Sequence, residues 1–334
     1  MNDKIWTIGR ILKWTEQYFR DKGIESPRLD AEVLLAHVLE KQRIYLYVHF
    51  DEPLQPAELA AYREMIKQRV LRVPVAQILG EKEFMGLTFK VTADALVPRP
   101  DTEILVQAAV ERLKAMKGEK TAAGVSDVTD ADMLADESPA EEPAEGQPAG
   151  GADAEQEVAE PLHIADIGTG SGAICLSVLR YLAGTVADTV DISPAARAVA
   201  EENAASLGLQ DRVTFHTGDL LQPLVGMTFA AILSNPPYIP EADIATLAPE
   251  VRLKEPHTAL SGGRDGLDFY RRLAKEAPAM LVPGGFMAFE VGIHQAEPVA
   301  ALAKANPLIA RTEILPDYAG IDRVVVAWRT KECQ

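Results

Sequence analysis

Residues 161–334 alternate short apolar runs with longer amphipathic stretches, and this alternation restricts the possible folds more than any other feature of the chain. Helical patterns follow most of the apolar runs. The runs have the length and composition of buried strands, and they lie at 162–167, 186–190, 212–216, 229–234, 286–291, 311–315 and 322–328. Strands that alternate with helices in this way predict an α/β fold with a doubly wound sheet of about seven strands.

The first part of the chain has a helical pattern instead. Apolar side chains recur at helical spacing over 5–21, 27–41 and 56–70, with a short segment at 44–48. These segments predict a bundle of four or five helices in residues 1–72. The bundle holds no cluster of catalytic side-chain types, so we interpret it as a packing and substrate-binding module.

A linker at 73–116 joins the bundle to the alternating region. Pro and Gly punctuate residues 73–91 and predict a β-hairpin, and the rest predicts an amphipathic helix that begins at Pro100. Proline suits a first helical position, and Asp101 and Glu103 suit the positive end of a helix. An ion pair between Arg99 and Glu103 would account for both charged side chains.

Residues 117–160 predict a disordered acidic insertion ahead of the first strand. Their composition buries too little apolar surface to offset the entropy of ordering. Residues 121–160 hold 12 acidic side chains and no Lys or Arg, so they account for most of the net charge of −17 and leave −5 for the rest. The remainder lacks the basic stripe of a duplex-binding protein, so we predict no stable nucleic-acid partner.

Composition also argues against other classes of protein. The two cysteines are Cys175, in a predicted buried helix, and Cys333, so no disulfide framework is expected and a cytoplasmic location fits. No apolar run approaches the ~18 residues of a membrane span, and no secretory signal is visible at the N-terminus. The six histidines show no ligand spacing, so we predict no metal site.

The first apolar run ends in a glycine-rich turn, Gly168-Thr169-Gly170-Ser171-Gly172, which leads into a helix. Such a turn lets a ligand approach the backbone closely, although the spacing differs from that of dinucleotide folds. The second run ends at Asp191, where a carboxylate can accept from ribose hydroxyls. The third ends at Gly218-Asp219, which suits an adenine amino group. A helix N-cap is an alternative role, but it fits Ser193 better than Asp191.

The fourth run ends in Asn235-Pro236-Pro237-Tyr238. Two prolines cannot continue a strand ladder, so the asparagine comes at the carboxyl end of a strand, where open α/β sheets bind ligands. The Asn235 amide oxygen and the Pro236 carbonyl can accept the two hydrogens of a planar NH2 group and leave its lone pair aimed at an electrophile. These four residues alone leave a purely structural Asn-Pro turn open.

In combination these motifs resemble the S-adenosylmethionine-dependent methyltransferases that modify amide or amino nitrogens. Further segments narrow the resemblance to the peptide chain release factor N5-glutamine methyltransferases, the PrmC/HemK family. It covers nearly the whole chain apart from the acidic insertion. The additional segments are 29–37, 72–77, 84–86, 98–103, 262–266 and 317–323.

The resemblance implies a seven-stranded Rossmann-like methyltransferase domain at 161–334, with its last strand antiparallel. It implies transfer of a methyl group from S-adenosyl-L-methionine to the amide nitrogen (N5) of the glutamine in the Gly-Gly-Gln motif of class 1 peptide chain release factors. The expected partners are release factors 1 and 2, and the expected state is a monomer.

The resemblance also implies roles for the motif residues. Asn235 and Pro236 would hold the substrate amide as catalytic residues. Further substrate contacts would be Pro237, Tyr238, Arg99 and Glu103, with Tyr238 walling the pocket. The implied cofactor-binding residues are Asp166, Gly168, Thr169, Gly170, Ser171, Gly172, Asp191, Asp219, Leu220 and Asn235.

Three features depart from the family pattern. Leu220 stands where many relatives have an aromatic residue, so adenine packing there would be purely apolar. Asp188 is polar within a predicted buried strand, and nothing in the sequence accounts for it. The acidic insertion is unusual and would loop out.

Three other functions stay open. A ribosomal-protein glutamine methyltransferase has the same tetrapeptide, although residues 98–103 favour the release-factor branch. An adenine-N6 DNA methyltransferase would use the same clamp, but the chain has no basic target-recognition region. A non-catalytic release-factor-binding protein is disfavoured by the intact glycine turn, ribose ligand and tetrapeptide.

Overall fold

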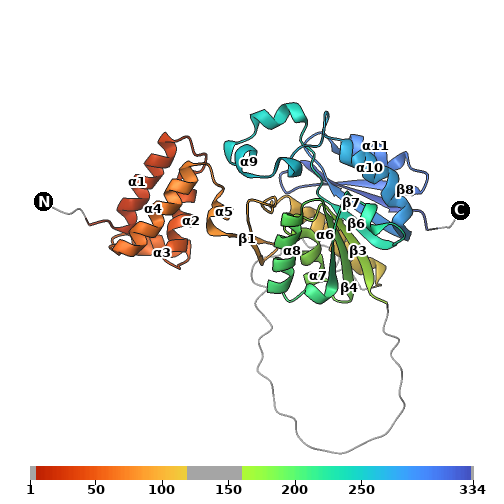
Figure 1. The fold of residues 1–334 in the computed structure, drawn as a ribbon, viewed down its shortest axis with the longest axis horizontal. Helices are drawn as coiled ribbons and strands as arrows, with labels where there is room; N and C mark the ends of the chain where they lie inside the picture. The colour runs from red at the N-terminus through yellow and green to blue at the C-terminus, as the bar shows by residue number, and fades with distance from the viewer. Residues whose placement is uncertain (1–4, 119–159, 332–334) are drawn as a thin grey trace, which may run out of the picture.

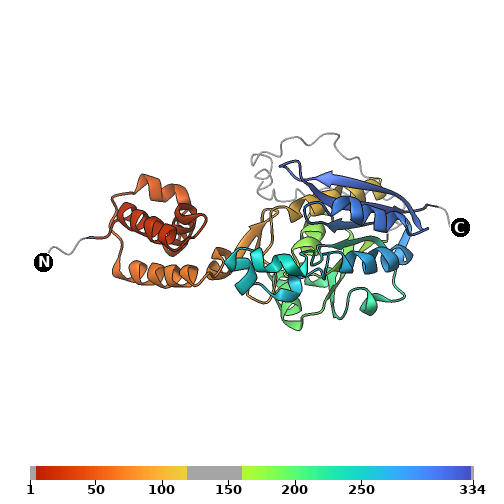
Figure 2. The same ribbon diagram turned by 90° about the horizontal axis from the view of Figure 1, so that it is seen from above.

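The computed structural model describes residues 5–118 and 160–331 (Figure 1). A helical bundle at the N-terminal end stands beside a larger α/β unit, and the view from above shows the same separation (Figure 2). The predicted acidic insertion at 117–160 lies outside the described residues except at its two ends. No helix in the described ranges is both long and apolar enough to cross a membrane.

Four helices of the described residues lie within the predicted bundle at 1–72, and a fifth follows in the predicted linker. They are α1 (Ile8–Asp21), α2 (Pro27–Val38), α3 (Arg43–Val48), α4 (Pro56–Val70) and the short α5 (Val75–Leu79). Their shared core includes Leu12, Phe19, Leu35 and Tyr62. The second helix ends three residues earlier than predicted, and Glu40, just beyond it, has a positive φ of 54° that a helix cannot continue.

The linker differs from its prediction in two places. Ile78 and Leu79, expected in the hairpin linker, lie in α5 and pack against the core of the bundle. The hairpin itself is β1 (Glu81–Phe84) and β2 (Leu87–Lys90), joined by Met85 and Gly86, whose φ angles of 51° and 65° suit a two-residue hairpin turn. Helix α6 (Thr102–Met116) begins after Asp101, so Pro100 precedes the helix.

The α/β unit is built on a seven-stranded sheet with the order β5-β4-β3-β6-β7-β9-β8. Strand β9 runs antiparallel to both of its neighbours, as the resemblance implies for the last strand. The strands are β3 (Leu162–Ile167), β4 (Thr185–Asp191), β5 (Val213–Thr217), β6 (Phe229–Ser234), β7 (Leu281–Glu290), β8 (Ile309–Pro316) and β9 (Asp322–Arg329). The segment Pro283-Gly284-Gly285, predicted as a turn, lies inside β7, whose register against β6 is irregular near that segment.

Helices cover both faces of this sheet (Figures 1 and 2). One core lies under α6, α7 (Ala173–Tyr181) and α8 (Pro194–Ser206), and the other under α10 (Asp268–Glu276) and α11 (Ala296–Lys304). Within β6, Leu233 belongs to the first core and Ile232 to the second. Burial on both faces explains why the strands are continuous apolar runs in the sequence.

A buried ion cluster joins the bundle to the α/β unit. Arg69 of α4 donates to Asp30 of α2 and to Glu250, both at 2.7 Å, and its side chain is 6% exposed. Glu250 belongs to α9 (Pro249–Lys254), a short helix that the sequence analysis did not predict. Removing one member would leave a costly buried charge, so the cluster holds α9 against the bundle.

The structure accounts for Asp188, which the sequence left unexplained. The carboxylate lies between two histidines on the neighbouring strands, His163 on β3 and His216 on β5, and each ring Nε2 is hydrogen-bonded to one carboxylate oxygen. Burial alone would raise the pKa of Asp188, but the hydrogen bonds from the two histidines outweigh it and hold the pKa below its ordinary value. Asp188 therefore links three strands through its side chain.

We expect Asp188→Ala to lower the free energy of unfolding by roughly 1–3 kcal/mol at pH 7, because both imidazoles lose their acceptor. The depressed pKa means that the carboxylate stabilises the fold at neutral pH and loses this effect as the pH falls through its native pKa. The difference between mutant and wild type should therefore shrink below pH ~4. Urea unfolding checks this, with the exposed Asp211→Ala as control; equal stability of the Asp188 mutant and wild type at pH 7 would contradict it.

Candidate active site

Strands β3 and β6 are neighbours in the sheet, and their last residues, Ile167 and Ser234, are register partners. The Ser234 hydroxyl donates to the Ile167 carbonyl at 2.6 Å. From β3 the chain continues to β4 on one side and later returns to β6 on the other, which opens a crevice at the carboxyl ends of the strands. The glycine turn and the Asn-Pro-Pro-Tyr segment therefore begin at the same crevice.

The glycine turn leaves open space above its backbone. Gly168 and Gly170 have φ angles of 77° and 56°, which disfavour other residues, and a Cβ at either would meet nothing within 4 Å. Asp166 is fully buried, and its Oδ2 accepts from Thr169 Oγ1 at 3.0 Å and Cys175 N at 3.3 Å. Burial raises the pKa of Asp166 to about 6, although these hydrogen bonds oppose the shift. Asp166 thus holds the turn in shape.

Asp191 connects the second strand to the glycine turn. Its Oδ2 accepts from Gly170 N and its Oδ1 from Ser193 N, both at 2.9 Å. A carboxylate has further acceptor sites beyond these two bonds, which remain available to ribose hydroxyls. Ser193 is the N-cap of α8, where its Oγ accepts from Ala196 N at 3.2 Å, so the capping role belongs to Ser193 as the sequence analysis favoured.

The carboxylate of Asp219 forms an ion pair with an arginine of α10. Arg272 Nη1 and Nη2 donate to its two carboxylate oxygens at 3.0 and 2.7 Å. The next residue, Leu220, has a φ of 48° and contacts the second sheet core. Ile192, which follows Asp191, is 64% exposed. Leu220 and Ile192 thus offer apolar surface to a planar ring beside two carboxylates.

Asn235 directly follows β6. Its Nδ2 donates to Thr102 Oγ1 at 3.2 Å, so its Oδ1 is the end left for another donor. Pro236 is buried, and Tyr238 packs against the second sheet core with its backbone carbonyl accepting from Gln295 Nε2 at 2.9 Å. Burial raises the pKa of Tyr238 to about 12.

Arg99 and Glu103 do not form the predicted ion pair. Arg99 Nη2 lies 2.6 and 2.7 Å from the two carboxylate oxygens of Glu255, whose side chain is 1% exposed. Glu103 Oε1 accepts instead from the backbone N of Met85 in the hairpin turn at 2.9 Å. The sequence could not reveal this exchange of partners, because Glu255 lies in a loop far along the chain.

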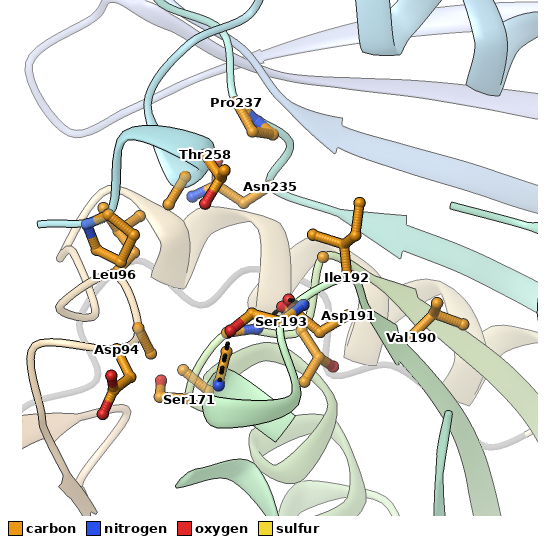
Figure 3. Close-up of a pocket in the computed structure, with 18 of the residues that line it drawn as sticks. Asp94, Leu96, Ser171, Val190, Asp191, Ile192, Ser193, Asn235, Pro237 and Thr258 are labelled. Carbon is orange, nitrogen blue, oxygen red and sulfur yellow. Dashed lines mark hydrogen bonds between the residues drawn. The ribbon is translucent and has the colours of Figure 1, made fainter. Parts of the chain in front are cut away.

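These elements enclose a cavity of about 370 Å³ (Figure 3). Ten of the residues with predicted roles line this cavity: Arg99, Gly168, Thr169, Gly170, Ser171, Asp191, Asp219, Leu220, Asn235 and Pro237. Five residues with predicted roles are not in its wall: Asp166, Gly172, Pro236, Tyr238 and Glu103. Tyr238 in particular does not wall this cavity, because it packs into the sheet core; its substrate contact stays a prediction.

Other parts of the wall were missed in the sequence. Asp94 and Leu96 lie on the side opposite Asp191, and Thr258 lies close to Asn235 (Figure 3). The segment at 256–259 contains a 3-10 helix, His257–Ala259, and lines the cavity, and Arg99 is paired with the adjacent Glu255. Thr102 could have been predicted as a site residue, because it lies in the motif at 98–103. No motif in the sequence pointed to residues 256–259.

The cavity fits a cofactor with an adenosine group and a charged tail. Its volume lies within the ~300–1,000 Å³ of ligand pockets, and its wall combines carboxylates for ribose, apolar side chains for a ring and an open glycine turn. Buried Asp166 Oδ1 has no hydrogen-bond partner among the described residues, so an acceptor next to the turn is unused. This fold and site define an S-adenosylmethionine-dependent methyltransferase that acts on a planar nitrogen group.

Comparison with known proteins gives the family. Residues 10–80 match the PrmC N-terminal domain, and residues 155–263 match the methyltransferase small domain. The release factor glutamine methyltransferase of Geobacter sulfurreducens is 40% identical over 96% of this chain and 96% of its own length. That of Moorella thermoacetica is 41% identical over 93% and 94%. The chain belongs to the release factor glutamine methyltransferase family.

A solved structure, the hMettl16 catalytic domain in complex with the MAT2A 3'UTR hairpin 1, matches 80% of this chain and 81% of its own chain at 14% identity with a TM-score of 0.49. This match is too distant to carry weight. The family assignment rests on the relatives and the family models.

We expect Asp191→Ala to weaken S-adenosylmethionine binding roughly 10- to 100-fold, because it removes a charged acceptor and releases the amides of Gly170 and Ser193. Isothermal titration calorimetry measures the effect. Glu201→Ala removes the same charge from the exposed face of α8 and serves as the control. An unchanged dissociation constant for Asp191→Ala would show that this carboxylate does not hold the cofactor.

Proposed function

We propose that this protein transfers a methyl group from S-adenosylmethionine to the N5 amide nitrogen of the glutamine in the Gly-Gly-Gln motif of class 1 release factors. The observation that carries the proposal is the position of Asn235, beside the glycine turn and on the wall of the cavity. The names of the relatives favour release factors over a ribosomal protein or DNA as substrate.

The chemistry requires alignment above all. A carboxamide nitrogen is a poor nucleophile, because its lone pair is delocalised into the carbonyl. The bound cofactor supplies a methyl group on a sulfonium centre that is already a strong electrophile. Placement of reacting atoms in line at about 3–3.5 Å can contribute ~7–11 kcal/mol to lowering the barrier.

Asn235 and Pro236 perform this alignment. In the proposed complex the Asn235 Oδ1 and the Pro236 carbonyl accept the two N–H groups of the glutamine amide and fix its plane. The same two acceptors oppose the positive charge that grows on the nitrogen as the N–C bond forms, an effect that is strong in a site shielded from water. As the N–C bond forms, the bond between the methyl carbon and the sulfonium sulfur breaks, and its electron pair stays on the sulfur of the product, S-adenosyl-L-homocysteine. The nitrogen, made acidic by the new bond, then releases one N–H proton to water.

The N-terminal bundle is proposed to dock the release factor. More than half of the exposed large apolar side chains in the described residues lie in the bundle. Three aromatic rings form one cluster there: Trp14 lies edge-on to Trp6 at 6.3 Å and stacks on Tyr18 at 5.1 Å. Trp6 and Trp14 are 37% and 47% exposed, and exposed aromatic clusters of this kind are typical of protein interfaces.

The proposal also concerns the location and the oligomeric state of the enzyme. A substrate that belongs to translation favours a cytoplasmic location, and a sequence with only two cysteines fits that compartment. The monomeric state stays a prediction.

The first test uses purified, unmethylated release factor and labelled S-adenosylmethionine. Wild type should add one methyl group to the Gly-Gly-Gln glutamine, located by mass spectrometry, and Asn235→Ala should lower kcat by at least about 100-fold. Cofactor affinity, measured by calorimetry, should stay close to wild type. Methylation at another residue would overturn the proposed substrate, and near-normal turnover by Asn235→Ala would overturn the role of the clamp.

The second test concerns docking. Trp14→Ala should raise KM for intact release factor about 10-fold, the cost of losing one interface anchor of ~1–2 kcal/mol, and leave kcat and cofactor affinity unchanged. Val225→Ala is the matched control, because Val225 is an exposed apolar residue of the α/β unit, 79% exposed. Equal KM values for wild type and Trp14→Ala would remove the aromatic cluster from the docking surface.

A further inference from the structure

A buried chain of hydrogen bonds lies behind Asn235. Asn235 Nδ2 donates to Thr102 Oγ1 at 3.2 Å, and Thr102 Oγ1 donates to Glu290 Oε2 at 2.6 Å. Thr102 is 5% exposed and Glu290 1% exposed. The carboxylate therefore sits in the protein interior, hydrogen-bonded to the threonine and close to the Asn235 side chain.

Three separate elements bring this chain together. Thr102 is the first residue of α6, and Glu290 is the last residue of β7. Ser234 and Phe289 are register partners on β6 and β7, so the residues that follow them, Asn235 and Glu290, lie at the same level of the sheet. The positions of Asn235 and Glu290 thus follow from the sheet itself, and α6 inserts the hydroxyl between them.

The hydrogen bonds from Asn235 to Glu290 all run in one direction, from donor to acceptor. An ionised carboxylate can only accept hydrogen bonds, so the single hydroxyl hydrogen of Thr102 must point at Glu290. The threonine oxygen then offers only lone pairs to Asn235, and only the NH2 end of the asparagine amide can bind there. The oxygen end is left facing away, toward the cavity.

We propose that Glu290 and Thr102 are positioning residues that hold the Asn235 amide with Nδ2 inward and Oδ1 toward the substrate. This inference rests on the proposed function, since it explains how the clamp always presents an acceptor to the glutamine NH2. With the amide reversed, the NH2 of Asn235 would face the NH2 of the glutamine, donor against donor. The reversed form could not hold the substrate nitrogen.

The ionisation of Glu290 controls the direction of the chain. Burial raises the pKa of Glu290 to about 7, and the hydrogen bonds from Thr102 and Asn235 and the charge of Arg323 oppose the shift. A protonated Glu290 can donate to Thr102, whose hydroxyl hydrogen is then free to point at Asn235 and favour the reversed amide.

The titratable and charged groups around Glu290 shift its pKa, but its own ionisation still decides the direction of the hydrogen bonds. Asp101, at the start of α6, raises the pKa and Arg323 of β9 lowers it. Tyr270 of α10 donates to the backbone carbonyl of Glu290 at 2.6 Å, and burial keeps the pKa values of Tyr270 and Tyr238 far above neutrality. Neither tyrosine changes charge near pH 7. Because Glu290 ionises as the pH rises through that value, the form with Asn235 Oδ1 toward the substrate should become more populated.

The first experiment measures turnover. Thr102→Val keeps the shape of the side chain without the hydroxyl and should lower kcat about 10- to 100-fold, the range expected for a misplaced reacting group. Thr102→Ser keeps the hydroxyl and should restore most of the turnover. Wild-type kcat should rise with pH around 7, whereas Glu290→Gln should have a lower kcat without that rise. KM for release factor and the affinity for S-adenosylmethionine should change little in all three variants.

The second experiment needs no methyl transfer. The chain has four asparagines, so selective 15N labelling gives a simple NMR spectrum in which Asn235→Ala identifies the Asn235 side-chain amide. In the free protein this signal should shift with pH around 7 in wild type and not in Glu290→Gln.

The outcomes separate the two proposals. If wild type shows the NMR shift but leaves release-factor glutamine unmethylated, the proposed function fails and the hydrogen-bond chain stands. If wild type methylates glutamine while Thr102→Val has normal kcat, or the Asn235 signal does not respond to pH, the positioning proposal is overturned. A Thr102→Val protein that does not fold leaves the Glu290→Gln profile and the NMR titration as the deciding measurements.

Discussion

The parallel pairing of β3 with β6 is the constraint on which the site depends. Because Ile167 and Ser234 are partners at the ends of these strands, the glycine turn and Asn235 start from the same edge of the sheet. The chain leaves β3 in one direction and reaches β6 from the other, so no strand crosses the crevice between them. A shift of one residue in this register would turn Ser234 and its neighbours to the opposite face and separate the clamp from the cofactor cavity.

Buried acids hold the rest of the site around this edge. Asp166 accepts a hydrogen bond from Thr169 of the glycine turn, Glu255 forms an ion pair with Arg99, and Glu290 accepts a hydrogen bond from Thr102. Each lies inside the protein, where an unpaired charge is costly, so each fixes its partner firmly. The most buried of them have raised pKa values, about 6 for Asp166 and about 7 for Glu290, which is a common property of groups at functional sites.

Two ion contacts relate the helical bundle to the cavity. Arg69 of the bundle binds Glu250 at one end of α9, and Arg99 of the linker binds Glu255 just beyond its other end. The loop after Glu255 forms part of the cavity wall. A protein substrate docked on the bundle would thus be connected through α9 to the place where the cofactor binds, which suits an enzyme that must present one glutamine of a large partner.

The sequence alone determined the fold class, the bounds of β3 and β6, and the place of the glycine turn, Asp191 and Asn235 at the ends of strands. These follow from local patterns: apolar periodicity, turn residues and the position of a polar residue at the end of a strand. Only the tertiary structure decided the partners of Arg99 and Glu103, the acceptor role of Asp188 between two histidines, and the place of Thr102 and Glu290 behind Asn235. Hydrogen bonds and ion pairs join residues distant along the chain, and many carboxylates could satisfy one arginine. The choice among them is made by which side chains the packed sheet and helices bring within about 3 Å of one another.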